Sequence, residues 1–296
     1  MAGTSGNDTP LRRFCADFAA SRIALAGLAL FAAILVVAVC APLLSPQDPY
    51  DLRQLDIMDG RQPPMTQSMG GYTFWLGSDD QGRDMLSAIF HGLRTSLGVG
   101  AMSALGALAI GAAAGLVAAY FGGRVESLIM RVVDIQLSFP SILVALILLA
   151  VLGQGTWKIV VALICVQWAY YARTVRGTAL VERRKEYVEA ARCLALGHRR
   201  IVFRHILPNC MPPLIVVVTV QVAHAIALEA TLSFLGIGLP ITEPSLGLLI
   251  ANGFEYLLSG KYWISFFPGI ALLATIVSIN LVGDQLRDIL NPRLQR

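Results

Sequence analysis

The sequence has few charged residues and few of the side chains that catalyse reactions or bind metals. Asp, Glu, Lys and Arg make up 14% of the 296 residues, and only four histidines are present. No set of histidine, cysteine and carboxylate residues stands at catalytic or metal-ligand spacing. The five cysteines form no paired spacing, so neither a disulfide framework nor a zinc site is indicated. We therefore expect no catalytic residue, metal or cofactor in this chain.

The sequence also lacks the phosphate-binding loop of ATPases. That loop has a glycine, four further residues and then Gly-Lys followed by Ser or Thr. Gly260 and Lys261 are followed by Tyr262, and Glu255 stands where the first glycine is required. The chain is therefore not expected to hydrolyse ATP by itself. Its net charge of +4 is small and does not indicate nucleic-acid binding.

Apolar residues, in contrast, are abundant and gathered in long runs. They make up 56% of the chain, and the mean hydropathy of +0.66 is too high for a soluble globular domain. We predict an all-α integral membrane protein with six transmembrane helices, at 23–44, 96–120, 136–152, 159–172, 214–235 and 263–282. The first run would span roughly 33 Å at about 1.5 Å per residue, enough for the hydrocarbon core. A cleaved signal peptide would have a shorter run ending in small residues, which residues 38–40 match poorly.

These runs alternate with polar segments that indicate the topology. The predicted parts are a tail at 1–22, the first helix at 23–44, an extracytoplasmic loop at 45–93, a five-helix core at 94–283 and a tail at 284–296. Most of the 23 Lys and Arg residues fall in the two tails, at 124–131 and at 173–205. Because cytoplasmic loops are enriched in Lys and Arg, we place both termini and the loop 181–209 in the cytoplasm.

The loop 181–209 is the only long stretch dense in charge. Within it, Tyr187, Ala191 and Leu194 recur at helical spacing, which predicts a short helix with one apolar stripe. Helices of about ten residues are marginal alone in water, so we expect a partner protein to bind this stripe, with Ala191 closest to it. The alternative is a basic loop that only fixes the topology of the chain.

The same loop contains signals for two helices. Gly197 favours the end of the first helix. A second short helix from about Arg199 would end at Pro208, because proline cannot continue the hydrogen-bond ladder of a helix. We therefore predict two short helices at an angle, with the turn at Gly197.

Three parts of this loop resemble the EAA loop in the membrane subunits of bacterial ABC importers. They are Glu189-Ala190-Ala191, the glycine at 197 and Ile206-Leu207-Pro208. In that family the first helix of the loop is the coupling helix, which binds in a groove of the cytoplasmic ATPase subunit. The residues that this resemblance assigns to ATPase coupling are Tyr187, Glu189, Ala190, Ala191, Arg192, Leu194, Gly197, Ile206, Leu207 and Pro208. One difference is that the family usually has its glycine six residues after the glutamate, where this chain has Ala195.

Other segments resemble the permeases of dipeptide, oligopeptide and nickel importers. Residues 75–84 resemble a segment, LGTDDxGRD, that these permeases carry just ahead of the second membrane helix. From the residues alone, Asp79 and Asp80 in this segment favour a structured turn with an Asp–Arg pair over a metal site. Residues 229–238 resemble the end of the family's fifth helix, although the Pro-x-Trp-Gly that usually follows is Pro-Ser-Leu-Gly at 244–247. Residues 283–293 match the family's ending, so the resemblance covers nearly the whole chain.

The resemblance implies a type I ABC importer permease fold in the inner membrane of a bacterium. The expected partners are a second, homologous permease, two ATP-binding subunits that carry ATP and Mg²⁺, an extracytoplasmic substrate-binding protein and membrane lipid. The cargo would be a peptide, although nickel and other small solutes share this scaffold. The alternatives from other classes are a self-sufficient secondary transporter, for which internal repeats with interrupted helices are not evident, and an intramembrane enzyme, which would need a catalytic constellation.

Polar side chains within the fifth apolar run are candidates for the translocation pathway. Gln221, His224 and Thr231 fall near one stripe of the predicted helix, whereas Glu229 and Ser233 lie on another. A buried acid costs roughly 2 to 3 kcal/mol on insertion scales unless it faces a cavity or has partners. The candidates are therefore Gln221, His224, Glu229 and Thr231, and the alternative is that they hold helices together.

Overall fold

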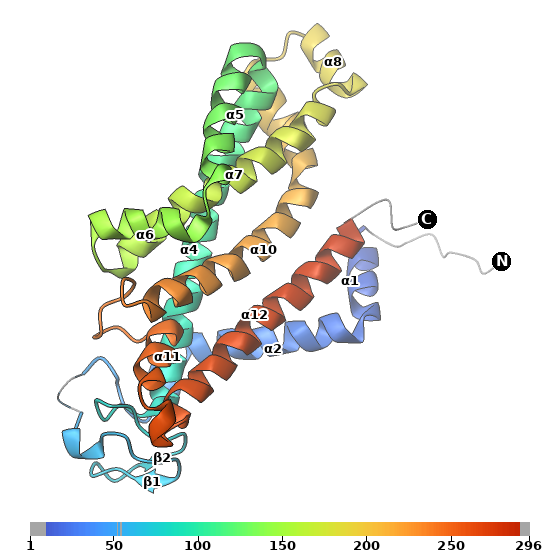
Figure 1. Ribbon diagram of the computed structural model, residues 1–296. Coiled ribbons are helices and arrows are strands. Elements are labelled where there is room, and N and C mark those ends of the chain that lie inside the picture. The colour runs from blue at the N-terminus through green and yellow to red at the C-terminus, as the bar shows by residue number, and fades with distance from the viewer. Residues whose placement is uncertain (1–9, 52, 54, 291–296) are drawn as a thin grey trace.

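The computed structural model describes residues 10–51, 53 and 55–290 and shows an elongated bundle of helices with one small sheet (Figure 1). The predicted tail residues 1–9 and the last residues, 291–296, lie outside the described residues, Pro292 and Arg293 included. The α-helices are α1 (Pro10–Ala20), α2 (Arg22–Val39), α3 (Ala41–Leu44), α4 (Met85–Phe121), α5 (Gly123–Ser138), α6 (Ser141–Leu152), α7 (Thr156–Glu182), α8 (Glu186–Cys193), α9 (His198–Arg200), α10 (Leu207–Phe234), α11 (Leu246–Phe254) and α12 (Trp263–Leu290). The remaining elements are the 3-10 turns η2 (Ile57–Asp59) and η4 (Leu257–Ser259), the π-helix η3 (Ile201–Ile206), and the strands β1 (Thr66–Gln67) and β2 (Thr73–Phe74).

Four helical segments among the described residues are long and apolar enough to cross a membrane: α2, α4, α12 and the continuous segment from α9 through α10. Helices α5 and α6 together would add a fifth, but they are bent by 93° around Pro140. Proline favours an extended residue before it, and Phe139 is accordingly extended at φ −95° and ψ 143°. The predicted number of six spans is not confirmed, because α7, at the fourth predicted run, includes Lys158, Arg173 and Arg176.

The long helix α4 starts earlier than the sequence predicted. Its 37 residues begin at Met85, whereas we expected the outer loop to continue to residue 93. The reason is an N-cap at Asp84, whose carboxylate accepts a hydrogen bond from the Ser87 N–H at 2.8 Å. The helix therefore extends from the outer loop, across the bundle, to the opposite end of the molecule (Figure 1).

Glycines let α4 pack against α7 at very short distance. A Cβ atom at Gly111 would lie 2.3 Å from the carbonyl oxygen of Trp168, and one at Gly115 would lie 2.5 Å from that of Ala172. Only glycine avoids these clashes, and small residues are what membrane helices use for close association. Gly111 and Gly115 therefore allow α4 and α7 to pack closely.

Two helices that the sequence did not predict flank the long ones. Helix α1 precedes α2 and packs against α12, and α11 lies between α10 and α12. Ser245 caps α11, since its hydroxyl accepts a hydrogen bond from the Leu248 N–H at 3.2 Å. Gly247, two residues after Ser245, lies so close to α10 that a Cβ atom on it would be 2.2 Å from the carbonyl oxygen of Ala230.

The outer loop contains the predicted turn with an Asp–Arg pair. Arg83 is almost fully buried, with its Nε atom 4.0 Å from the Asp79 carboxylate, while the other carboxylate oxygen accepts from two backbone N–H groups. Burial raises the pKa of Asp79 to about 6, although the nearby Arg83 opposes this shift. The Nη2 atom of Arg83 also donates to the carbonyl oxygen of Ile241 at 2.8 Å, so the turn is attached to the segment after α10.

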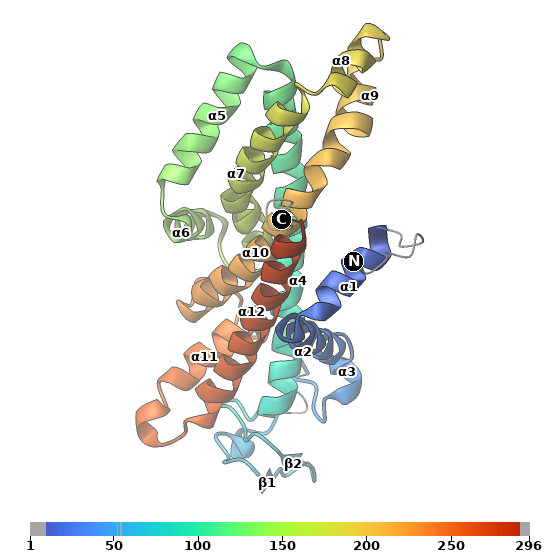
Figure 2. The same ribbon diagram turned by 90° about the vertical axis from the view of Figure 1, so that its right-hand side faces the viewer.

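The two polar regions lie at opposite ends of the molecule. Helix α8 and the rest of the charged loop form one end, and the outer loop with β1 and β2 forms the other, in both views (Figures 1 and 2). Long helices connect the two ends, as expected when a membrane separates two polar compartments.

Candidate coupling surface and translocation cavity

Helix α8 forms as the sequence predicted, with charges suited to its ends. Glu186 and Glu189 lie in its first turn and Arg192 in its last turn. Negative charge near the N-terminus and positive charge near the C-terminus each interact favourably with the helix dipole. The predicted first helix of the charged loop is therefore confirmed.

The predicted apolar stripe on α8 is wrong at Ala191. Val188 and Ala191 are buried in a cluster formed by this chain itself, with side chains from α4, α7 and α10. Tyr187 is 37% exposed and Leu194 is 73% exposed, so they do not share the buried face of Ala191. Ala191 is therefore not the point of closest approach to a partner. The exposed face of α8 is formed by Glu186, Tyr187, Glu189, Ala190, Arg192 and Cys193, and continues to Leu194.

The turn after α8 is centred on Ala195, and the predicted helix stop at Gly197 is wrong. Ala195 has a left-handed conformation with φ +53°, whereas Gly197 is extended with φ −60°. The Leu196 N–H reaches back to the carbonyl oxygen of Ala191 at 3.1 Å, which closes the helix as in a Schellman motif. The position where the family usually has glycine is therefore the one that needs a left-handed residue, and here alanine occupies it.

The second predicted helix does not end at Pro208. Segments α9, η3 and α10 follow one another without interruption, and Pro208 is the second residue of α10, directly after the π-helix η3. Ile206 is buried, Leu207 is half-buried and Pro208 is exposed. The coupling segment therefore continues directly into a membrane-spanning helix. A π-helix such as η3 is uncommon and occurs frequently at functional sites.

Hydrogen bonds fasten the charged loop to the ends of α4 and α7. The hydroxyl of Tyr120, the second-to-last residue of α4, lies 2.6 Å from His198 Nδ1, and the guanidinium of Arg192 lies over the Tyr120 ring at 5.8 Å. Arg183 donates to the carbonyl oxygen of Ala119 at 2.8 Å. These contacts hold the loop in one position relative to the membrane helices. No pattern in the sequence indicates these contacts, because the partners are far apart along the chain.

Glu182, at the end of α7, also binds the start of the charged loop, and no sequence pattern indicated this role. Its carboxylate accepts hydrogen bonds from Lys185 Nζ and from the Tyr187 hydroxyl, both at 2.6 Å. Burial alone would raise the pKa of Glu182, but these two bonds outweigh it and lower the pKa. Burial and the bond to Glu182 raise the pKa of Tyr187 to about 12. Tyr187 therefore fixes the start of α8 to the end of α7, in addition to presenting part of its ring to solvent.

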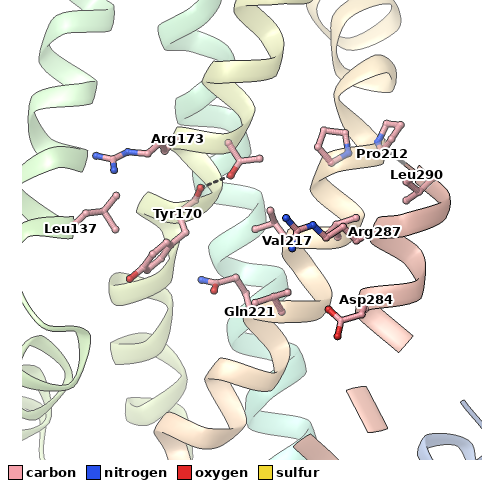
Figure 3. A pocket seen from close by; sticks show the side chains of 14 residues that line it. Leu137, Tyr170, Arg173, Pro212, Val217, Gln221, Asp284, Arg287 and Leu290 are labelled. Carbon is pink, nitrogen blue, oxygen red and sulfur yellow. Dashed lines mark hydrogen bonds between the residues drawn. The ribbon is translucent and has the colours of Figure 1, made fainter. Parts of the chain in front are cut away.

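One predicted pathway residue lines a large cavity in the bundle. The cavity has a volume of about 840 Å³ and lies between α5, α7, α10 and α12 (Figure 3). Gln221 forms part of its wall, and Tyr170, Arg173, Asp284 and Arg287 are lining residues that the sequence analysis did not identify. A concave, mainly apolar space with a few polar groups is typical of ligand-binding sites.

The other predicted pathway residues lie elsewhere. His224 is half-buried, one turn beyond Gln221, and Thr231 is exposed with its hydroxyl donating to the carbonyl oxygen of Ala227. Glu229 is fully buried, and its carboxylate accepts hydrogen bonds from Ser96 at 2.8 Å and Ser233 at 2.7 Å. Because Ser96 belongs to α4, Glu229 joins α10 to α4. This geometry is that of a packing residue.

Comparison with known proteins agrees with this architecture. Residues 85–296 match the family described as binding-protein-dependent transport system inner membrane component. The chain belongs to this family. Residues 9–64 also match the N-terminal TM domain of oligopeptide transport permease C. The chain is therefore a transport permease of the inner membrane.

Individual relatives of this permease cover almost its full length. It is 37% identical over 287 residues to the di/tripeptide transport system permease protein DppC of Pseudomonas aeruginosa, covering 97% of this chain and 93% of the relative. It is 34% identical over 279 residues to the oligopeptide transport system permease protein OppC of Bacillus subtilis, covering 94% and 88%. A chain of the MetNI methionine ABC transporter, solved in inward-facing conformations, matches with a TM-score of 0.57 at 19% identity, covering 70% of this permease and 98% of that chain. The fold is therefore that of a type I ABC importer permease.

Proposed function

We propose that this permease forms half of the translocation pathway of an ATP-driven importer for short peptides, and that it couples to the ATPase through the loop 181–209. The observation that carries the proposal is the outer face of α8, which is exposed at the end of the molecule. The opposite face packs against this chain, and hydrogen bonds at Tyr187 and His198 hold the loop in place. A fixed helix with a free face can transmit force from a docked partner to the membrane helices. This permease would need two ATP-binding subunits, which supply ATP and Mg²⁺, because its own sequence has no phosphate-binding loop.

The peptide cargo is supported by the relatives that cover nearly the full length of the chain. Those relatives are named for di/tripeptide and oligopeptide transport. The remaining partners would be a second, homologous permease that completes the pathway and an extracytoplasmic binding protein that delivers the peptide. Import of nickel or another small solute on the same scaffold is the alternative. Uptake assays with labelled peptides and with Ni²⁺ distinguish the two.

The docking role of α8 can be tested with one exposed apolar residue at each end of the molecule. Leu194→Asp places a charge on the proposed ATPase contact, so co-purification of the ATPase subunits and peptide-stimulated ATP hydrolysis should both fall. Ile57→Asp is the matched control, because Ile57 is 88% exposed in the outer loop, at the opposite end. It should leave co-purification unchanged. Full co-purification and full coupling for Leu194→Asp would refute the docking role.

The orientation that this proposal requires is tested by labelling in intact cells. A cysteine at Met69, which is 72% exposed in the outer loop, should react with an impermeant thiol reagent. A cysteine at the exposed Arg199 should react only after the membrane is opened. Ser68 is unsuitable as the outer site, because it is buried and donates to the Asp59 carboxylate at 2.6 Å. The reverse labelling pattern would exclude a cytoplasmic ATPase contact at α8.

A further inference from the structure

The cavity of Figure 3 has two charged side chains of opposite sign on one of its walls. Asp284 and Arg287 both lie on α12, three residues apart, and both line the cavity. Both are exposed, and neither forms an ion pair with any residue in the described part of the chain. Arg173, on the facing helix α7, differs because its guanidinium is paired with Asp134 on α5. The α12 pair is therefore available to a ligand that carries both charges.

A buried amide with an unused hydrogen-bond donor lies on the α10 wall of the same cavity. Gln221 is 7% exposed, and its Nε2 atom has no hydrogen-bond partner among the residues that the structure describes. Its backbone carbonyl oxygen is already occupied by Gln167 Nε2 at 3.1 Å. A buried polar group without a partner is costly, so such groups in native proteins require an explanation. The Nε2 atom is enclosed by the surrounding protein, so the polar groups that the cavity presents to a ligand are the charged side chains of α12.

Apart from Gln221, the wall that α10 contributes is apolar. The residues that form it from α10 are Pro212, Pro213, Val216, Val217 and Val220. Such a surface accepts side chains of different shapes without specific hydrogen bonds, because apolar contact is non-directional. The polar groups of the cavity therefore recognise something other than a particular side chain.

We propose that this cavity is a binding site for the main chain of a short zwitterionic peptide, with Arg287 binding the terminal carboxylate and Asp284 the terminal ammonium group. The proposal rests on the function proposed above and names the groups of the peptide that the permease itself recognises. Residues three apart on a helix have Cβ atoms about 5 to 6 Å apart, and long side chains extend this reach. A dipeptide extends over about 7 Å, which suits the pair.

Protection of an engineered cysteine tests this site without the delivering protein, which would select peptides independently. Val220→Cys, at a position 48% exposed in the cavity wall, is introduced into the assembled importer, with the exposed Cys15, Cys165 and Cys193 replaced by alanine. The rate of its reaction with a maleimide is measured with dialanine, with dialanine amide and with N-acetyldialanine. Dialanine should slow labelling severalfold, and the two blocked peptides should slow it much less.

Charge-removing variants then assign the two ends of the peptide. Arg287→Gln should make dialanine no better than dialanine amide, and Asp284→Asn should make it no better than N-acetyldialanine. Arg131→Gln, an exposed arginine of α5 outside the cavity, is the matched control and should keep full protection.

The outcomes separate the site from the function. Absence of protection by dialanine, in a complex that transports dialanine when its binding protein is added, would overturn the site and leave the proposed function standing. A cysteine at Val220 that never reacts in the assembled complex would show that a helix of the second permease fills the cavity, which also overturns the site. A complex that transports no peptide would refute the proposed function itself.

Discussion

Two neighbouring alanines in α8 should respond oppositely to the same substitution. Ala190 is exposed on the outer face, whereas Ala191 is 4% exposed and packed in the cluster beneath α8. Ala190→Trp adds a large ring to the proposed ATPase contact and leaves the chain's own packing intact. Ala191→Trp adds the same ring to a filled interior.

The expected magnitudes follow from where the ring must go. Overpacking a well-packed site typically costs about 1 to 3 kcal/mol. For Ala191→Trp this penalty falls on the fold, so the purified permease should unfold at a lower temperature and accumulate less. For Ala190→Trp the same penalty falls on the complex, where it corresponds to about 5- to 150-fold weaker ATPase binding.

Two measurements on each variant distinguish the sites. Thermal unfolding of the solubilised permease alone should be unchanged in Ala190→Trp and lowered in Ala191→Trp. Titration with the ATPase subunits should show a lower affinity for Ala190→Trp. The fraction of Ala191→Trp that folds should bind with an affinity closer to that of the unsubstituted permease. Equal thermal stability of both variants, with binding lost only in Ala191→Trp, would refute the orientation of α8.

Three further predictions test other parts of the structure. Ala195→Gly should stabilise the turn after α8 by up to about 1 kcal/mol, because glycine accepts a positive φ without strain, while Gly197→Ala should be neutral; a thermal shift in the opposite order would show that the turn lies at Gly197. Glu229→Gln should retain transport with modest loss, because an amide still bonds the two serines, whereas Glu229→Leu leaves both hydroxyls unpaired and should be worse; equal full activity of both would show that this joint is dispensable. Because burial raises the pKa of Asp79 to about 6, its contribution to stability is present below about pH 4 and is lost as the pH rises through about 6. Asp79→Asn should flatten that part of the thermal-unfolding profile, and an unchanged profile would mean that this carboxyl group does not titrate there.

The sequence predicted helices well where a single physical rule determines them. The apolar runs located the long helices, and the turn residues at 79–84 located the Asp–Arg pair. Predictions that depend on what an element packs against were less reliable. The apolar spacing of Ala191 indicated a buried face but could not show whether this chain or a partner buries it. Pro208 indicated a helix end, but proline is equally compatible with a first turn, and the unpredicted π-helix before it makes that turn continuous with the loop.

The residues that line the cavity also could not be grouped from the sequence. Gln221 was identified because a polar residue within an apolar run is conspicuous. Asp284 and Arg287 belong to a segment that resembles the family's ending, and nothing in their spacing indicates a cavity. Their relation to Gln221 depends on how α10 and α12 pack, and no spacing within one helix contains that information.

The unbroken length of α4 has a consequence for how the two compartments communicate. At about 1.5 Å per residue, its 37 residues extend over roughly 55 Å, and it contains no proline at which to bend. Its first residue follows the Asp84 cap beside the outer loop, and its second-to-last residue, Tyr120, bonds His198 in the charged loop. A rigid rod of this length that tilts by about 5° about one end moves its other end by about 5 Å, roughly the rise of one helical turn. In the importer proposed above, a protein that presses on the outer loop would displace the charged loop through α4, so the docking of a loaded binding protein would reach the proposed ATPase contact as a tilt of one helix.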